Sequence, residues 1–544
     1  MPKGVYRIER RYQLISTIDV IIIFGYILAL LVMGWFLGKD NKDQEDYFLA
    51  GRSMPWLPIS LSVAATMISA NGFIGAPGWA YTSGVSPYMV NIGVPLAVFF
   101  VMWLTMPVFY QLKLTSIYEY VEKRLGISSR MLTVFGFFAN SIIQVSSMVF
   151  VPALIIQYFT GWSLAVVVPI VVLSAIVYTL LGGIKAVIWT DALQMCVMWL
   201  GLFATIFIIL DKTGMGFFET LGQAKEAGKL AALDFSFDIS RTNAFWATLI
   251  GGTVMWIRYF GFDQGQVQRI FTAKSMKGVK KSFLTSAIVM NVMYFLFMIV
   301  GVMLAVFYGG KEFEAANSVM IDFISNHLPV GLVGLIVAGV FAAAMSSVDS
   351  LLNSMSTVYV KDIHERFFSK TGEQASLRMS MMISAVWGMI IIIVTLMAFS
   401  GTTKSILDVV GSYISYISGP MCGAFFLALF TYKANDKGVT GGVILGFFMT
   451  FMFGKYSGAS WIWKPAVGMV STFAFGYIIS LITSSKRTID EIKEFTILGM
   501  REKMIKENNT VEDGVTILPM KMDIYTWSLL GFFFVQYIIL ALIA

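Results

Sequence analysis

The sequence predicts an all-α integral membrane protein with about fourteen transmembrane helices. Of its 544 residues, 57% are hydrophobic and only 13% are charged, whereas soluble domains carry about 25% charged residues. The mean hydropathy is +0.76, and apolar runs of helix length recur along the chain. Because a backbone in lipid must pair its own N–H and C=O groups, such runs form helices. They are too long for the alternating strand segments of a membrane barrel.

The apolar segments that we expect to span the bilayer lie at approximately 17–37, 56–81, 87–112, 130–158, 163–181, 187–210, 244–264, 282–308, 329–358, 376–399, 405–431, 437–456, 464–484 and 522–543. The first is expected to be retained, since no small-residue cleavage site follows it. The hydrophilic stretches 211–243 and 485–521 contain too few apolar residues for a second domain. Residues 1–544 are therefore expected to form a single membrane domain.

Lys and Arg residues concentrate in the loops after the odd-numbered spans. The positive-inside rule then places 38–55, 113–129, 265–281, 359–375 and 485–521 in the cytoplasm and both termini outside. These loops also account for the net charge of +7, so we expect the lipid bilayer as a partner and no nucleic acid. Cys196 and Cys422 both lie in apolar segments, which argues against a disulfide framework or a cysteine metal site.

Two spans are interrupted by small, hydroxyl and Gly/Pro residues. The second contains Ser60–Gly72, followed by Gly75, Pro77 and Gly78. The seventh contains Gly251–Thr253, followed by Arg258, Gly261, Asp263 and Gly265. Weak helices at matching places in two halves of a chain indicate a transport site, although Gly-rich spans also occur for close helix packing alone. This spacing predicts two five-helix repeats at about 56–210 and 244–431. The peripheral helices would then be 17–37, 437–456, 464–484 and 522–543.

Charged residues inside apolar spans cost about 2.5–3.5 kcal/mol on insertion and usually mark function. Asp191 lies in the sixth span and Asp349 in the ninth, while Arg258 and Asp263 lie in the second half of the seventh. Arg258 either pairs with Asp263, five residues further on, or faces a central cavity and binds a substrate carboxylate.

Three serines surround Asp349 on the ninth span. Ser346 and Ser350 share a helix face, and Ser347 lies beside them. Hydroxyls next to intramembrane carboxylates and a broken partner helix indicate a site for a hard cation such as Na⁺. The alternative is that these serines bond back to their own helix carbonyls.

Several blocks of sequence resemble the sodium:solute symporter family, the relatives of the sodium/glucose cotransporters. They occur in the family's order between about residues 17 and 431. The blocks are Asp46–Arg52, Gly182–Gln194, Phe245–Trp246 with Ile250–Thr253, Gln264–Arg269, and Phe341–Ser347 with Leu352–Ser354. The resemblance implies inverted five-helix repeats (a LeuT-like core), alternating access, and uptake of a small organic solute driven by Na⁺.

The resemblance also implies where sodium binds. The main sodium site would use Ala65, Ile68, Ala343, Ser346 and Ser347. A second sodium site, found in some relatives, would use Asp191, Ser346, Asp349 and Ser350. Because Asp349 replaces the serine of a sialic acid transporter in the family, it would either strengthen that second site or carry a proton, and the stoichiometry stays open.

For the solute, the resemblance favours a carboxylate-bearing anion. Of the positions that match sugar-binding residues in the family, Met67, Gly72 and Asn91, only Asn91 is polar here, and Gln144 matches a cavity arginine of the sialic acid transporter. The block from Phe245 to Arg269 is most similar to the branch that carries monocarboxylates, vitamins and iodide. Arg258 would anchor the carboxylate, and Trp256, Tyr259 and Met67 would form apolar walls.

Other classes of protein fit the sequence less well. A sugar or polyol symporter is the alternative within the family. A channel needs a continuous pore, and an enzyme needs a catalytic constellation that His327 and His364, both near span ends, do not supply. A non-transporting solute sensor would share the fold, but no signalling domain is expected after the last span. We therefore expect a multi-pass transporter of the cell membrane, such as a bacterial inner membrane.

Overall fold

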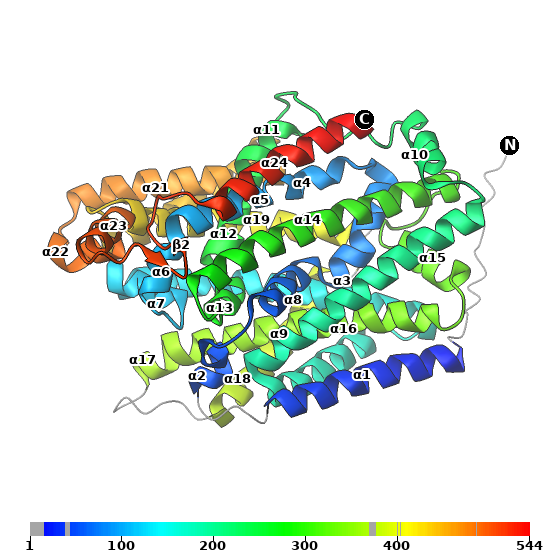
Figure 1. Cartoon of the computed structure of the whole chain (residues 1–544), viewed down its shortest axis with the longest axis horizontal. Helices are drawn as coiled ribbons and strands as arrows, with labels where there is room; N and C mark the ends of the chain where they lie inside the picture. The colour runs from blue at the N-terminus through cyan, green and yellow to red at the C-terminus, as the bar shows by residue number, and fades with distance from the viewer. Residues whose placement is uncertain (1–15, 39–43, 369–376, 400, 403, 486) are drawn as a thin grey trace.

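The structure is a computed structural model of the whole chain, and it describes residues 16–38, 44–368, 377–399, 401–402, 404–485 and 487–544. Its long helices run roughly along the long axis of the molecule (Figure 1). Among these described residues, eleven helical segments are long and apolar enough to cross a membrane, and shorter apolar helices cover Leu164–Ser174 and Met382–Ala398. The all-α membrane architecture is confirmed, whereas the count of fourteen spans stays a prediction.

The long helices are α1 (Thr17–Gly38), α3 (Trp56–Ser83), α8 (Ile127–Thr160), α9 (Leu164–Thr213), α14 (Met276–Phe307), α16 (Leu332–Val358), α18 (Leu377–Ala398), α19 (Ile406–Phe430), α20 (Asp436–Tyr456), α21 (Lys464–Ile482) and α24 (Ile524–Ile543). Shorter helices α4 (Met89–Ile92), α5 (Val94–Phe100) and α6 (Met106–Gln111), with the π-helical η3 (Val101–Thr105), make up the predicted third span. The seventh consists of α11 (Phe245–Ala247), the π-helical η4 (Thr248–Gly252) and α12 (Thr253–Phe262).

The remaining elements connect the long helices. They are α2 (Gln44–Leu49), η1 (Ala50–Arg52), η2 (Ser86–Tyr88), α7 (Ile117–Arg124), α10 (Phe217–Glu226), α13 (Gln264–Phe271), α15 (Ser318–His327), η5 (Tyr359–His364), α17 (Glu365–Phe367), η6 (Trp461–Trp463), α22 (Ile489–Ile492), η7 (Lys493–Phe495), α23 (Ile497–Lys506), β1 (Val511–Glu512) and β2 (Val515–Thr516). The strands β1 and β2 pair antiparallel.

Breaks in the helices occur near two of the predicted interruptions. In α3 the backbone leaves the helical region at Ser69, where φ is 44° and ψ is −174°, so the interruption predicted for the second span is present. In the seventh span, helical bonding continues through Gly251 and Gly252 as a π-helical turn, and the chain breaks only at Asp263. The break at Asp263 lies within the stretch predicted to be interrupted, whereas Gly251 serves packing, because it lies directly against the carbonyl of Ile462 and a side chain would not fit there.

The predicted fifth and sixth spans are two halves of α9. Gly183 joins them with φ of 61° and ψ of 178°. Only glycine adopts this backbone conformation without strain, which explains why the chain can turn there inside an apolar segment.

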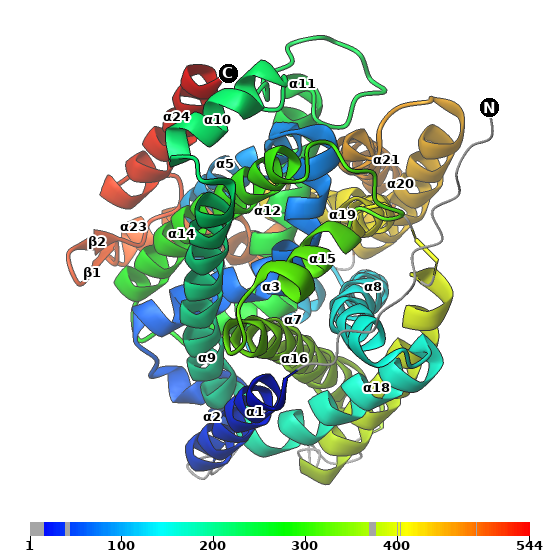
Figure 2. The ribbon, with the colours of Figure 1, turned by 90° about the vertical axis from the view of Figure 1, so that its right-hand side faces the viewer.

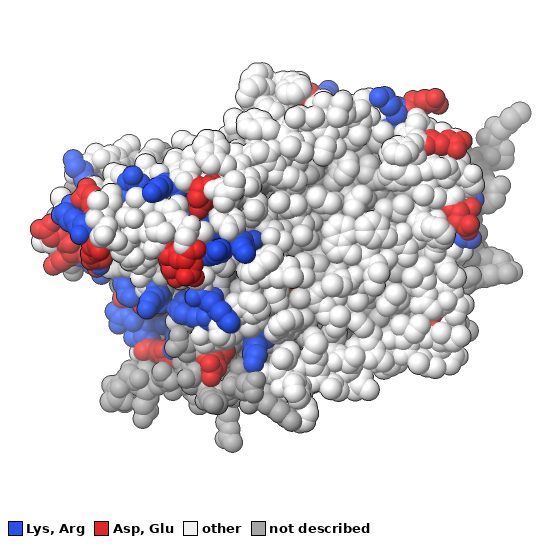
Figure 3. All heavy atoms as spheres, viewed as in Figure 1, with Lys and Arg blue, Asp and Glu red and all other residues white. Residues whose placement is uncertain are grey.

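Charged side chains gather at the two ends of the molecule. Figure 3 shows Lys, Arg, Asp and Glu over the end that holds α22 and α23 and along the opposite edge, with an uncharged belt between them. The end with α7, α13, α17 and α23 is called the α7 end below, and the opposite end, near α10 and α15, is called the α15 end (Figure 1). A broad uncharged belt is the surface expected of a protein surrounded by lipid.

The broken helix α3 lies in the interior of the bundle. Viewed along the long axis, α3 and α12 lie near the middle, while α1, α18, α20, α21 and α24 lie around the outside (Figure 2). Helix α3 packs along α14 and also contacts α9 and α16, and α12 packs against α5 and α19. Both predicted weak helices are thus surrounded by protein, which is the only place where irregular backbone is tolerated at membrane depth.

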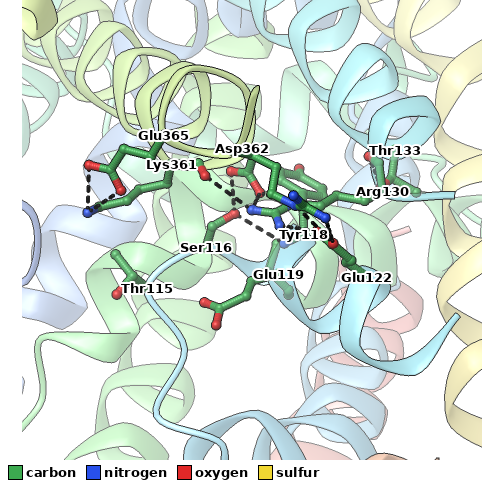
Figure 4. Close-up of polar contacts among 12 residues, drawn as sticks. Thr115, Ser116, Tyr118, Glu119, Glu122, Arg130, Thr133, Lys361, Asp362 and Glu365 are labelled. Carbon is green, nitrogen blue, oxygen red and sulfur yellow. Dashed lines mark hydrogen bonds and ion pairs between the residues drawn. The ribbon is translucent and has the colours of Figure 1, made fainter. Parts of the chain in front are cut away.

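A network of ion pairs joins α7 and α8 to the end of α16 (Figure 4). Arg130 donates to Asp362 at 2.7 Å and also pairs with Glu122. Ser116, which caps α7 by accepting from the backbone of Tyr118, donates to the other oxygen of Asp362 at 2.7 Å. Since Arg130 and Asp362 are both buried, each charge depends on the other for compensation.

The predicted hydrophilic loop 485–521 folds onto the α7 end. The Tyr120 hydroxyl donates to the Phe495 carbonyl at 2.8 Å, and the Tyr110 hydroxyl donates to Glu512 at 3.0 Å. The segment is thereby attached to α6 and α7.

Close packing of α14 on α3 gives a first prediction. Gly301 of α14 touches the Pro77 carbonyl, and a Cβ there would also lie 2.7 Å from the Cβ of Ala80. We expect Gly301→Ala to destabilise the fold by about 1–3 kcal/mol through overpacking, measured as a lower melting temperature of the purified protein. Gly531→Ala in α24, where no atom lies within 4 Å, is the matched control. An unchanged melting temperature for Gly301→Ala would contradict the packing described here.

Candidate functional site

The break in α3 leaves backbone groups without helical partners. A residue with the φ and ψ of Ser69 cannot continue the ladder of bonds between residues four apart. Ala65 and Ile68 lie in the turn that precedes this break, where the end of a helix offers its carbonyls to other partners. Ala65 and Ile68 are both buried, so these carbonyls face other parts of the protein.

Helix α16 packs against this part of the bundle and brings hydroxyls with it. Ala343 and Ser347 are both buried, and the Ser347 hydroxyl has no hydrogen-bond partner among the described residues. The backbone of Ser346 belongs to α16, but its side chain lies outside the described part of the structure. A buried hydroxyl without a hydrogen-bond partner is the kind of oxygen that a hard cation takes.

Asp191 is held by a buried network between three elements. Its carboxylate accepts from the Ser62 hydroxyl of α3 at 2.5 Å and lies 3.6 Å from a terminal nitrogen of Arg269 in α13. Arg269 also donates from Nε to the Ser62 hydroxyl at 2.9 Å. Asp191 thus has a guanidinium beside it, a neighbour that the sequence did not reveal.

Asp349 and Ser350 lie on α16, close to α2. Both are buried, and the Ser350 hydroxyl has no hydrogen-bond partner among the described residues. Burial raises the pKa of the Tyr47 phenol in α2 above its ordinary value, and the Asp349 carboxylate raises it further. The negative charge of Asp349 is therefore close enough to influence α2.

A cavity lies beside the break in α3. Of the residues predicted to bind substrate, Met67, Asn91, Gln144, Trp256 and Tyr259 line it. The sequence did not single out its other walls, which include Ser69, Asn71, Trp79, Ser147, Met148, Met255, Tyr294, Met298 and Trp461. Gly72 is not among the lining residues, and its Cα faces Tyr294, whose hydroxyl would lie 3.4 Å from an added Cβ.

The cavity is apolar with a few neutral polar groups. The described residues that line it include methionines, tryptophans and tyrosines together with the amides Asn71, Asn91 and Gln144, and they include no Asp, Glu, Lys, Arg or His. Trp461 reaches the cavity from outside the two predicted repeats and is fixed by a hydrogen bond of 2.8 Å to Asp408. Apolar walls with a few placed polar groups are typical of sites for small organic molecules.

Arg258 does not line this cavity. Its guanidinium donates to Asp263 at 2.7 Å, and both side chains are almost fully buried. In the amide orientation that gives both of its ends a partner, the Asn140 side-chain oxygen accepts from both terminal nitrogens of Arg258 at 3.2 Å. Of the two alternatives that the sequence left open for Arg258, the ion pair is the one present. The ion pair forms because α12 ends at Phe262, which brings Asp263 within reach of the guanidinium. Without the pair, each of the two groups would be a buried charge with no compensation.

Comparison with known proteins decides the family. The model of the sodium:solute symporter family matches residues 47–446. The chain belongs to the sodium:solute symporter family. As a sodium:solute symporter it couples the movement of sodium to that of a small solute, as its sequence predicts.

Relatives of this symporter include transporters that are named for different acids. It is 27% identical to a sodium/sialic acid symporter of Aliivibrio fischeri over 89% of this chain and 97% of that protein. It is 29% identical to the sodium-coupled monocarboxylate transporter 1 of Mus musculus over 80% of this chain and 73% of that protein.

Solved structures support the same fold. A Na⁺-coupled sialic acid symporter in a substrate-bound, outward-open state superposes with a TM-score of 0.78, at 27% identity, over 87% of this chain and 99% of that one. A nucleobase-cation symporter in a closed conformation superposes with a TM-score of 0.55 at 13% identity, over 89% of this chain and 97% of that one, which shows likeness of fold alone.

The ion pair of Arg258 gives a second prediction. We expect Arg258→Gln to destabilise the symporter by about 3–5 kcal/mol, because Asp263 would keep a buried charge without a partner. The double variant Arg258→Gln with Asp263→Asn should recover a substantial part of the lost stability, since it removes both charges. Melting temperatures of the purified variants measure this. A stable Arg258→Gln protein that has lost anion binding would instead place Arg258 at the substrate.

Proposed function

We propose that this symporter imports a small, carboxylate-bearing organic anion together with sodium. The observation that carries the proposal is the helix break at Ser69, which adjoins both the cavity and the oxygen groups described above. The N-terminal end of the half-helix 70–83 carries a partial positive charge that favours an anion. The relatives named for sialic acid and for monocarboxylates also support an acid.

The proposed binding of a carboxylate does not require Arg258. A carboxylate can be received in a cavity without a basic side chain if helix N–H groups, neutral amides and a nearby bound cation balance its charge. Asn91 and Gln144 line the cavity and supply such amides. A sugar or polyol remains the second candidate, favoured by the same amides, because they also bind hydroxyl groups.

For the main sodium site we propose the carbonyls of Ala65, Ile68 and Ala343 with the hydroxyls of Ser346 and Ser347. The break in α3 supports this assignment because it frees carbonyl oxygens, and the unpartnered Ser347 hydroxyl supports it because a cation would satisfy that atom. Sodium bound there would join α3 to α16.

We propose a second sodium site at Asp191, Ser346, Asp349 and Ser350, although the charges around it are less favourable for a cation. Arg269 already compensates Asp191, so a cation near that carboxylate would face a guanidinium. The Ser350 hydroxyl and the Asp349 carboxylate are the groups that favour such a site. If Asp349 binds a proton instead, one sodium would be coupled to each solute.

We also propose that the protein resides in the cell membrane with the α7 end in the cytoplasm. The loops 113–129, 265–281 and 485–521, rich in Lys and Arg, support this orientation. The solute would then enter from the α15 end and leave at the α7 end.

The main sodium site gives a third prediction. We expect Ser347→Ala to raise the sodium concentration required for half-maximal solute uptake by about tenfold, because one cation ligand is removed. Ser354→Ala on the same helix is the matched control, since the Ser354 hydroxyl donates to its own helix at the Ser350 carbonyl. Uptake in liposomes at graded sodium concentrations measures the difference. Equal sodium dependence of the two variants would remove Ser347 from the site.

Symport itself is tested by ²²Na⁺ influx into liposomes that contain the purified protein. The proposal predicts that an added organic acid, from a panel of sialic acids and monocarboxylates, increases ²²Na⁺ entry. Stimulation by neutral sugars alone would leave a symporter for the second class of solute. Solute binding without ²²Na⁺ entry would identify a non-transporting sensor.

A further inference from the structure

One wall of the cavity is formed by Trp461, which lies outside the two predicted repeats. Trp461 begins η6, within the loop 457–463 that joins α20 to α21 and is called the η6 loop below. Its ring lines the cavity, and the residue is only 8% exposed. A peripheral segment of the chain therefore contributes a large aromatic side chain to the cavity.

The η6 loop lies at the α15 end of the molecule. Helix α20 begins at the opposite end, where Asp436 accepts from the Ser129 N–H at the start of α8 at 2.7 Å. Helix α19 begins at the α15 end, because the Ile406 N–H donates to Asn317, next to α15, at 3.3 Å. Seen from this end, α19, α20 and α21 lie side by side (Figure 2). Trp461 thus approaches the cavity from the side at which solute entry is proposed.

The Trp461 ring packs on a glycine of α19. A Cβ added to Gly411 would lie 2.6 Å from Cη2 of the ring, so a side chain at this position would displace the indole. The indole Nε1 donates to the Asp408 carboxylate at 2.8 Å, less than one helical turn before Gly411. Helix α19 therefore provides both a surface for the ring and an acceptor that sets its orientation.

The backbone on both sides of Trp461 is held by other segments. The Ser460 N–H donates to the Ile239 carbonyl at 2.8 Å. On the other side, the Ile462 carbonyl lies directly against Gly251 in the seventh predicted span. The ring can therefore leave the cavity by rotation of its side chain while the loop stays in place. That rotation breaks the hydrogen bond between the indole and α19.

We propose that Trp461 is a lid on the outer side of the cavity and that its ring limits the size of the solutes that enter from the α15 end. Asp408 is a positioning residue that holds the lid closed. The inference rests on the proposed function, which makes the cavity the solute site, and it concerns access to that site. An aromatic ring with one polar group suits this role, because it excludes water and is oriented by a single bond.

Labelling of a cysteine inside the cavity tests the lid without knowledge of the solute. Cys196 and Cys422 are replaced by alanine, and the reporter is Met148→Cys on the α8 side of the cavity. The reagents are methanethiosulfonates that carry an ethylammonium or a larger trimethylammonium-ethyl group. Their reaction rates with the purified full-length protein, in sodium and without solute, are measured by mass spectrometry. Since a minor open state makes up about 0.1–10% of molecules, Trp461→Ala should raise the rates at least about tenfold, and more for the larger reagent.

Matched variants separate a lid from a general loosening of the protein. Trp463→Ala makes the same change in the same loop, at a side chain that is not among the lining residues, and should leave the rates unchanged. Asp408→Ala should raise both rates, because the indole loses its acceptor. Asp408→Asn keeps an acceptor oxygen and should stay near the wild-type rates. A reporter at Phe218→Cys, where the native residue is 85% exposed at the α15 end, should react equally in every variant.

Three results would overturn the inference: equal labelling with and without the Trp461 ring, a rise in Trp463→Ala as large as that in Trp461→Ala, or equal rates for Asp408→Ala and Asp408→Asn. The two Asp408 variants decide the question if Trp461→Ala does not fold. The proposed symport is judged separately by solute-driven ²²Na⁺ entry, which can succeed or fail whatever the labelling rates are.

Discussion

The backbone of α3 sets the main constraint on this structure. A helix inside a bilayer satisfies its own N–H and C=O groups, and a break at Ser69 leaves some of them without partners. Such groups are tolerated only when protein, water, an ion or a ligand receives them. The packing of α14, α9 and α16 around α3 supplies protein on several sides, and the cavity beside the break leaves room for a solute.

The buried arginines described above pair with carboxylates of the protein and are not available to bind the solute. Arg258 pairs with Asp263, Arg269 with Asp191, and Arg130 with Asp362. The first pair spans the end of α12, whereas the other two join elements that are far apart in the sequence. Removal of either partner would leave an uncompensated charge. The described lining of the cavity stays neutral as a result, so recognition there depends on helix ends, amides and a bound cation.

The sequence predicted most of the spans and the interrupted second helix, because hydropathy and residues such as Gly75 and Pro77 act locally along the chain. It left the partner of Arg258 open, since Asp263 comes within reach only because α12 ends one residue earlier. Trp461 reaches the cavity from beyond both repeats, and no local pattern marks such a contact. The Asn71 side chain donates to the Ser147 hydroxyl of α8 at 2.8 Å, a contact between distant parts of the chain that only the three-dimensional structure reveals.

We propose that the break in α3 creates the site where sodium binds. High-resolution structures of the protein in sodium and in choline, in otherwise identical conditions, test it most directly. The account predicts density for a cation between the carbonyls of Ala65 and Ile68 and the hydroxyl of Ser347 in sodium, and its loss in choline. A sodium ion bound elsewhere, with these groups paired to other residues in both conditions, would contradict it.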